Sequence, residues 1–550
     1  MYPRKSIVHF SALRLFLLLS LSLLHSCGRH VKPGPSGFAD ESFADKLSES
    51  LTTIDTTGQS GKIRSVSEEL RLVYQADEYQ PIWVKENYSS TVAAAQLLTD
   101  LEEMQWDGVD PEVYNINDLR NLKTKLDTTK HNAVADAIRF DTTLTHSYLA
   151  ASRFLLLGSI KPRKADSLWH HVNDTVWNAA ELLLTSGGAY PALDSFRSEL
   201  PTYQALRKEY RMYRNLLADS SYLNAKFNMA QCWQNDSVIK VSADYIIRAE
   251  MPWVEVVPND SISDRKQLIM AYQRAHSLRV TRKLDSTTVA TLAVSPEDYL
   301  KKLCANMERI RWMKRKTGSL YIVVNVPLME LFFRKDGVDV MHKEVVVGKR
   351  ARQTPSLFAN MTNIVINPPW GVPPTILKND VLPGIQKSGR QYLAKKGLKV
   401  YTHEGKAVNV STINAKNYKR YTYKQAPGSD NSLGYVKFNM PNKWDIYLHD
   451  TPHREDFGKH DRALSSGCVR VHEPQEMALY ILAGLEQRTS YTQGKLDTMI
   501  STHKTRWELL KTKIPVFITY LTAFEDSTGA HIRFARDIYQ RDEKLMALMN

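Results

Sequence analysis

The spacing of apolar residues changes once along this chain, near Pro296. Before that point, stretches such as SVSEELRLVYQADEYQPIW and AIRFDTTLTHSYLAASRFLLLGSI carry apolar residues at three- and four-residue intervals, which is typical of amphipathic helices. After it, SLYIVVNVPLMELFFRKDGVDVMHKEVVVG alternates β-branched and polar residues, as strands do. A chain of 550 residues has room for several domains. The pattern therefore predicts a multidomain α+β protein in which helical domains precede a mostly-β domain.

The N-terminus predicts export from the cytoplasm. Arg4 and Lys5 precede a short apolar run that is typical of a signal peptide over residues 1–26. The residues Leu-His-Ser-Cys that end at Cys27 resemble a lipobox, with histidine at an atypical position, and this resemblance implies that Cys27 is lipidated. Ordinary cleavage with loss of Cys27 is the alternative. Lipidation would anchor an exported, periplasmic protein to a membrane.

The remaining sequence divides by composition and by the period of its apolar residues. The Ser-, Thr-, Gly- and Asp-rich residues after the signal peptide indicate a flexible tether. The predicted parts are a tether at 27–62, a helical scaffold domain at 63–230, a small helical domain at 231–298, a mostly-β domain at 299–490 with an inserted lid at about 375–434, and a C-terminal helix and closing hairpin at 491–550. A long insertion in a sheet is more often a functional lid than an idle loop.

The small helical domain resembles the helical peptidoglycan-binding repeat. The resemblance rests on the pair Tyr272 and Gln273, followed by His276, Leu278 and a Leu-Asp pair. The sequence departs from the repeat at residues 282–283, an Arg-Lys pair where such repeats usually have glycine. The resemblance implies wall binding, and a helical spacer of the same descent is the alternative.

The formal charge of +14 suits an acidic partner such as nucleic acid, anionic lipid or carboxylate-bearing cell wall. No nucleic-acid recognition motif accompanies the charge, so no nucleic-acid partner is expected. Without Cys27, three of the four cysteines remain: Cys232, Cys304 and Cys468. Cys232 and Cys304 fit helix positions and could be buried thiols or a disulfide. An odd number of thiols in an oxidising compartment leaves at least one free, and Cys468 is the best candidate.

Cys468 stands in the turn SSGCVR rather than in an apolar run. A reactive thiol needs a base, and His449 ends the strand WDIYLH 19 positions earlier. His453, His460 and His472 are competitors, for which solvent exposure or helix capping is the simpler explanation. The backbone N–H groups around Ser465, Ser466 and Gly467 could hold an oxyanion, and Arg470 would lie on the side of Cys468 and grip a carboxylate. Together these residues predict acyl transfer on a substrate with free carboxylates.

The histidine, the loop and the Ser-x-Gly-Cys-x-Arg pattern resemble the L,D-transpeptidase active-site signature. VVNVPLMEL, VVVGKRARQTP, NPPWGVPPTI and QAPGSDNSLGYVKFNMPN also resemble the large periplasmic branch of that family. The resemblance implies that Cys468 attacks the third residue of a tetrapeptide stem, releases D-alanine and passes the acyl group to an amine of another stem. It implies His449 as base, the carbonyl at Asp450 as its orienting group, and a site lined by Tyr447, Trp370 and Asn431.

The same resemblance implies no metal or other cofactor. It implies peptidoglycan stem peptides and cell-wall synthases as partners, and acylation of Cys468 by carbapenems. L,D-carboxypeptidase action and attachment of proteins to the wall use the same acyl-enzyme and stay open. From the residues alone, His449, Asp450, His453, His460 and Cys468 could instead serve a metal hydrolase. A non-catalytic, wall-binding lipoprotein is the other alternative.

Overall fold

The computed structural model describes residues 34–52 and 65–549, with gaps at 130, 132, 188, 232–235, 255–261, 316 and 415. This chain forms two compact units. The first contains the chain up to residue 98 with 115–149 and 178–191, and the second contains 99–114, 150–177 and 192–550. The predicted signal peptide, Cys27 and Cys232 lie outside the described residues. No helix in the described ranges is long and apolar enough to cross a bilayer.

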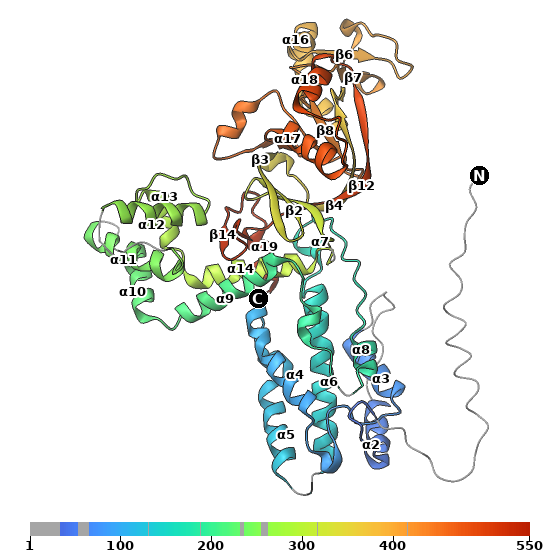
Figure 1. Ribbon diagram of the computed structural model, residues 1–550, viewed down its shortest axis with the longest axis vertical. Coiled ribbons are helices and arrows are strands. Elements are labelled where there is room, and N and C mark those ends of the chain that lie inside the picture. Colours follow the sequence, from blue (N-terminus) through green and yellow to red (C-terminus); the bar gives the residue numbers. More distant parts are fainter. Residues whose placement is uncertain are drawn as a thin grey trace, which may run out of the picture. The chain divides into compact units, whose positions relative to one another are not determined.

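The first unit is helical (Figure 1). Its helices are α2 (Glu41–Thr52), α3 (Val66–Ala76), the start of α4 (Val92–Glu102), α5 (Ile116–Thr128), most of α6 (Val134–Leu157) and α8 (Ala179–Thr185). Ser65 caps α3, because its side chain accepts a hydrogen bond from the Glu68 N–H. The buried Asp141 carboxylate accepts hydrogen bonds from the Tyr74 hydroxyl at 2.6 Å and the Trp83 N–H at 2.6 Å. This carboxylate thereby joins two segments of the unit.

Helix α2 corrects part of the flexible tether predicted over residues 27–62, since residues 41–52 are helical, while 27–33 and 53–62 lie outside the described residues. Phe43, Leu47 and Leu51 recur every four residues along it, and all three side chains are buried. This spacing places them on one face of a helix, where burial of apolar surface stabilises the fold. The many Ser, Thr and Asp residues around the stripe concealed it in the sequence.

The second unit begins with helices that lead to the sheet. They are α9 (Pro201–Leu216), α10 (Ser220–Gln231), α11 (Asp236–Glu250), α12 (Ile262–Ala275), α13 (Ser286–Leu292) and α14 (Pro296–Arg311). Pro296 occupies the first turn of α14, and Ser295 caps it by accepting from the Asp298 N–H at 3.1 Å. The change from helix to strand therefore comes later than Pro296. The first strand begins at Leu320.

The predicted small domain at 231–298 has its own apolar core. That core also includes Tyr222 and Met229 of α10, so the packed unit starts before residue 231. The buried Gln273 side chain donates to the Lys283 carbonyl at 3.0 Å and accepts from the Arg282 N–H at 3.0 Å, which joins α12 to the turn before α13. Arg282 has a φ of 60°, the left-handed conformation that glycine adopts most readily. The substitution of arginine for the usual glycine thus leaves the turn in place.

Asp107 is the centre of a buried polar network at the end of η2 (Glu103–Asp107). Its carboxylate accepts from the Arg197 guanidinium at 2.8 Å and from the Tyr203 hydroxyl at 2.8 Å, while Arg311 donates to its carbonyl at 2.7 Å. Asp107, Arg197, Tyr203 and Arg311 are all buried. Removal of one partner from such a network leaves a buried charge without compensation.

We expect Asp107→Ala to lower the free energy of unfolding by about 3–5 kcal/mol, because Arg197 then lacks its main counter-charge. The matched control is Asp118→Ala, which removes the exposed ion pair with Arg139 at 2.8 Å and should cost about 1 kcal/mol or less. Differential scanning calorimetry would measure both. Equal unfolding temperatures for the two variants would contradict the expectation.

The β-region contains a nine-stranded sheet in the order β10-β3-β11-β9-β8-β4-β12-β1-β2, and β2 also pairs with β3. The second pairing closes the sheet on itself, which leaves fewer open edges. The strands are β1 (Leu320–Asn325), β2 (Glu330–Lys335), β3 (Val338–Gly348), β4 (Leu357–Ile366), β8 (Val436–Asn439), β9 (Leu448–His449), β10 (Ala463–Ser465), β11 (Val469–Val471) and β12 (Arg506–Thr519).

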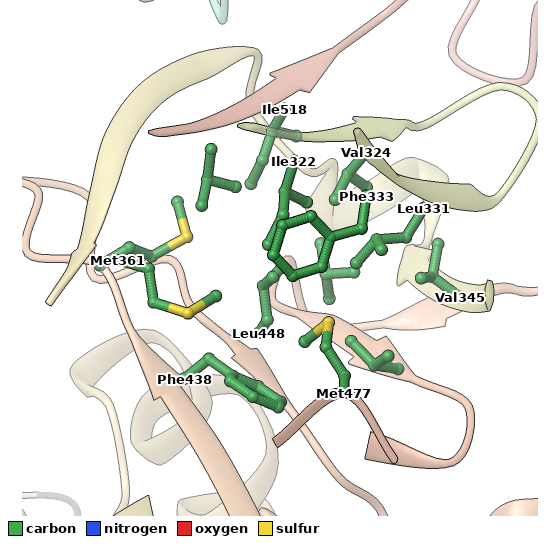
Figure 2. Packing of buried hydrophobic residues seen from close by; sticks show 14 of the residues in the cluster. Ile322, Val324, Leu331, Phe333, Val345, Met361, Phe438, Leu448, Met477 and Ile518 are labelled. Carbon is green, nitrogen blue, oxygen red and sulfur yellow. The ribbon is translucent and has the colours of Figure 1, made fainter. Parts of the chain in front are cut away.

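The core of this sheet takes alternate residues from its strands (Figure 2). Figure 2 shows Phe333, Phe438 and Leu448 pointing into a common interior, together with Met477 of α17 (Pro474–Leu479). All four side chains are almost fully buried. Since successive strand residues face opposite sides, the neighbours of these core residues are available for the other face of the sheet.

The C-terminal segment contains the helix and the hairpin predicted at 491–550, and it also supplies a central strand of the main sheet. After α18 (Gln493–Ser501), β12 pairs with β4 and, in parallel, with β1. A smaller hairpin of β13 (Ala523–Glu525) and β14 (Ile532–Phe534) follows, and α19 (Asp542–Met549) ends the described chain. A central strand from a distant part of the chain cannot be recognised from local alternation alone, because its partners are set by tertiary pairing.

The insertion predicted at 375–434 folds as a small subdomain, which we call the lid. Its elements are β5 (Trp370–Gly371), α15 (Pro374–Ile376), η6 (Leu377–Val381), α16 (Leu382–Lys395), β6 (Leu398–Tyr401) and β7 (Thr422–Gln425). Its strands form a separate sheet in the order β5-β7-β6, and its apolar core includes Val381, Leu393 and Tyr423. In Figure 1, α16, β6 and β7 gather at one end of the main sheet.

Candidate active site

The turn before β11 and the end of β9 bring the predicted residues to one face of the main sheet. β11 and β9 are parallel neighbours, with Val469 opposite Leu448 and Arg470 opposite His449. Val469 and Leu448 face the core, so Arg470 and His449 face the other side. By the same alternation, Cys468 lies on the face of Arg470 and His449.

A cavity of about 630 Å³ opens over this face of the sheet. Cys468 and His449 both line it, as do Arg470, Tyr447 and Trp370. Its opposite wall comes from the lid: Pro374, Thr375, Ile376, Asp380, Val381, Tyr392, Lys396, Leu398 and Gln425. The structure therefore places the predicted nucleophile and base in one cavity between the sheet and the lid.

The turn that presents Cys468 is held by its own polar groups. Gly467 has a φ of 118°, a conformation that favours glycine. The buried Ser465 hydroxyl accepts from the Gly467 N–H at 3.1 Å and donates to the Cys468 carbonyl at 2.6 Å. Ser466 is exposed, and its hydroxyl accepts from Arg352 at 2.9 Å. Since the Gly467 N–H is occupied, the Cys468 N–H is the better candidate donor to an oxyanion.

His449 is buried in a neutral form. Its Nδ1 lies 2.5 Å from the Asp450 carbonyl oxygen, which can only accept, so Nδ1 carries the hydrogen and Nε2 has a free lone pair. Burial, and to a smaller degree the Arg470 charge, lowers the pKa of His449 to about 3. The imidazole can therefore accept a proton at neutral pH.

Asp450 orients His449 through its main chain rather than its side chain. The Asp450 carboxylate accepts from the N–H groups of Tyr435 and Thr451, each at 2.8 Å. Gly434 packs directly against this side chain, since a Cβ at Gly434 would lie 2.4 Å from the Asp450 Cγ. The carboxylate thus holds the backbone whose carbonyl receives the histidine hydrogen.

The half-buried Cys468 thiol donates to the Asp445 carbonyl, with a sulfur–oxygen distance of 3.6 Å. Burial raises the pKa of Cys468, while hydrogen bonds from the Tyr447 backbone and hydroxyl and the charge of Lys437 act in the opposite direction. Among the described residues, no hydrogen bond joins Cys468 to His449. The resting site thus holds a neutral thiol and a neutral imidazole that are not hydrogen-bonded to each other.

The remaining predicted residues differ in position. Arg470 lines the cavity but already forms an ion pair with Asp456 at 3.1 Å, so it is only partly available to a substrate carboxylate. Asn431 is buried and does not itself line the cavity, although the next residues, Ser432 and Leu433, do, and its amide donates to the carbonyls of Pro368 at 3.1 Å and Ala426 at 2.8 Å. Asn431 therefore joins Pro368 and Ala426, which flank the lid strands β5 and β7.

Two cavity features were not predicted. Arg352 forms an ion pair with Asp380 of the lid and also contacts Ser466, so it connects the lid to the nucleophile turn. Asp445 supplies the carbonyl for the resting thiol. Nothing local in the sequence marks either residue, because each acquires its role from a partner that is distant in the chain.

The competing histidines His453, His460 and His472, and Cys304, do not join this pair. His453 borders the cavity but is exposed and pairs with Glu455 at 3.3 Å, while His460 borders a different cavity. His472 packs against the Phe457 ring at 4.7 Å. Within the ranges that the structure describes, no three His, Cys, Asp or Glu side chains could hold a metal ion. The Cys304 thiol is free, and burial raises its pKa to about 11.

The raised pKa of Cys468 predicts how the rate of thiol alkylation depends on pH. Because burial raises this pKa, the reactive thiolate is scarce at pH 7, and we expect the rate of alkylation by iodoacetamide to rise about tenfold per pH unit from pH 6 to 9. Mass spectrometry of tryptic peptides would measure the rate, and Cys304 provides an internal control that stays unmodified. A plateau below pH 8 would indicate a preformed thiolate–imidazolium pair instead.

Comparison with known proteins supplies a family. Residues 319–490 match the YkuD domain, the L,D-transpeptidase catalytic domain, and residues 68–209 match the Scaffold domain. A Haemophilus influenzae protein named "Putative L,D-transpeptidase" is 30% identical over 296 residues, which are 53% of this chain and 58% of that protein. A solved structure, "Structure of the Ldtfm-avibactam carbamoyl enzyme", is 12% identical over 38% of this chain and 51% of that chain, and its TM-score of 0.20 is too low to indicate a shared fold.

Proposed function

Because this chain belongs to the L,D-transpeptidase family, we propose that it is a peptidoglycan L,D-transpeptidase with Cys468 as its nucleophile. One observation carries the proposal: Cys468 lies in the turn before β11, His449 ends the adjacent strand β9, and both line the same cavity under the lid. A thiol and a neutral imidazole in one enclosed site suit nucleophilic acyl transfer.

In the first step the Cys468 proton passes to His449 Nε2, and the sulfur attacks the carbonyl of the third residue of a tetrapeptide stem. A sulfur–carbon bond forms, and the tetrahedral intermediate collapses when the bond to the terminal D-alanine breaks. His449 returns the proton to the departing amine. The Cys468 N–H is the proposed donor to the oxyanion, and the product is a thioester.

In the second step a side-chain amine of another stem attacks the thioester carbonyl. The amine loses a proton to His449, the sulfur–carbon bond breaks, and the proton returns to the Cys468 sulfur. The product is a cross-link between third residues of two stems. Water in place of the amine gives L,D-carboxypeptidase action, and an amine of a protein gives attachment of that protein to the wall.

The location of this chemistry is part of the proposal. A substrate in the cell wall requires an exported enzyme, in agreement with the predicted signal peptide and with lipidation of Cys27 to anchor the protein in the periplasm. Cell-wall synthases that supply nascent strands are its expected partners. Neither step needs a metal or another cofactor, because the leaving group is an amine that His449 can protonate.

Incubation of the purified protein with isolated sacculi, followed by muropeptide analysis, tests the proposal. We expect dimers joined through their third residues and release of D-alanine. Tripeptide stems without dimers would indicate a carboxypeptidase, and protein-modified muropeptides would indicate attachment. Loss of every product in Cys468→Ala protein would assign them to this site. A wild-type protein that forms no acyl-enzyme and changes no muropeptide would overturn the proposal.

Wall binding without catalysis is the second candidate, and one observation favours it. A cavity of about 780 Å³ in the small helical domain combines an apolar floor that includes Ile239 and Leu284 with basic side chains. The basic residues of its lining are Lys240, Arg265, Lys266, Arg282 and Lys283. A basic groove suits the carboxylates of stem peptides. Sedimentation with sacculi whose muropeptides stay unaltered would favour this function.

A further inference from the structure

Lys437 lies on the active-site face of the sheet although it does not line the cavity. β8 and β9 are antiparallel neighbours, and Lys437 stands opposite His449 in their register. Its neighbours Val436 and Phe438 point into the core, so alternation turns Lys437 to the face that carries Cys468. The side chain is half-buried.

The Lys437 ammonium contacts Tyr447, and Tyr447 in turn contacts Cys468. Its Nζ lies 4.0 Å from the centroid of the Tyr447 ring, a cation–π arrangement, and the Tyr447 hydroxyl is hydrogen-bonded to Cys468. Among the ion pairs of the described residues, none involves Lys437. A half-buried ammonium without a carboxylate partner is costly to the fold, and burial accordingly lowers the pKa of Lys437.

We propose that Lys437 is a positioning residue for acyl transfer: its ammonium, held against the Tyr447 ring, stabilises the negative charge that develops on the Cys468 sulfur and fixes the ring whose hydroxyl contacts that sulfur. This inference rests on the proposed function. When the thiol proton moves to His449 Nε2, the sulfur gains a full negative charge, and a fixed cation nearby lowers the energy of that state.

Other charged groups also act on Cys468 and His449. Arg470 on β11 is paired with Asp456 of η9 (Arg454–Gly458), and Asp445 precedes β9. The Arg470 charge lowers the pKa of His449, whereas Asp445 raises the pKa of Cys468. Lys437 lowers the pKa of both the thiol and the imidazole. Its removal must therefore move the titrations of both groups to higher pH.

The experiment compares Lys437→Met with Lys437→Arg, which retains the charge. Iodoacetamide alkylation of Cys468 between pH 6 and 10 reports the ionisation of the thiol without any substrate. In Lys437→Met we expect the profile to move up by about one pH unit, which is about tenfold slower alkylation at pH 7.5, and we expect Lys437→Arg to restore it. The matched control is Lys495→Met, since Lys495 is exposed and its Nζ lies 4.9 Å from the Tyr491 ring.

Turnover provides the second measurement. The acid limb of kcat/KM should also move to higher pH in Lys437→Met, with kcat reduced and KM unchanged. Lys437→Gln repeats the test if the methionine variant unfolds at a lower temperature than wild type. An unshifted alkylation profile in a folded neutral variant would overturn the proposal. An inactive wild-type protein would refute the proposed function but leave the alkylation result valid for Lys437.

Discussion

Cys468→Ala should abolish formation of the covalent acyl-enzyme. Carbapenem treatment of the wild-type protein is expected to add the mass of the opened drug to the peptide that contains Cys468, because the β-lactam carbonyl substitutes for the stem carbonyl. Without the sulfur no bond can form, so we expect the adduct to disappear and turnover on tetrapeptide stems to fall by at least about 10⁴-fold. Intact-protein mass spectrometry measures the adduct, and chromatography of released D-alanine measures the turnover.

The matched control for this variant is Cys304→Ala. Cys304 carries the other free thiol of the described residues, and burial raises its pKa to about 11, so it should contribute no nucleophile at neutral pH. We expect this variant to acquire the adduct at the wild-type rate. A Cys468→Ala protein that still gained the mass would require a different nucleophile.

His449→Gln should slow acylation by about 10²–10⁴-fold, the usual contribution of a general base. Glutamine can still donate a hydrogen bond to the Asp450 carbonyl, so the fold and the cavity should persist. The pH dependence gives a sharper test. With the pKa of His449 lowered to about 3 by burial, the wild-type rate should stay level from pH 5 to 8, because the base remains neutral throughout. In the variant the rate should rise tenfold per pH unit, because only thiolate formed by solvent can react.

His453→Gln is the control for the loss of an imidazole at the same cavity. His453 is exposed, and its one ion pair among the described residues joins it to Glu455, so its replacement should change the acylation rate by less than about twofold. Stopped-flow fluorescence of carbapenem acylation measures all three proteins. A level pH profile in His449→Gln, at the wild-type rate, would move the role of base to another residue.

The local sequence pattern predicted structure correctly where neighbouring residues share one environment. Apolar periodicity predicted the helical region and the β-region in the correct order, and the Ser-x-Gly-Cys-x-Arg turn predicted the family that the comparisons confirm. In the register of β9 and β11, His449 stands opposite Arg470, so His449 and Cys468 lie on one face of the sheet. Helix α2 escaped prediction because a stripe of three apolar residues is short beside the polar residues that surround it.

The amino-acid sequence by itself determined the family and the residues proposed for its chemistry, since the candidate reactive groups stand in one short segment with the turn residues that present them. Only the tertiary structure decided their electrostatic state and their surroundings. These surroundings include the burial of His449, the contact of Lys437 with Tyr447 and the ion pair between Arg352 and the lid. Each depends on residues that lie apart in the sequence. Desolvation and Coulomb energies depend on distances in space, and a linear pattern does not contain those distances.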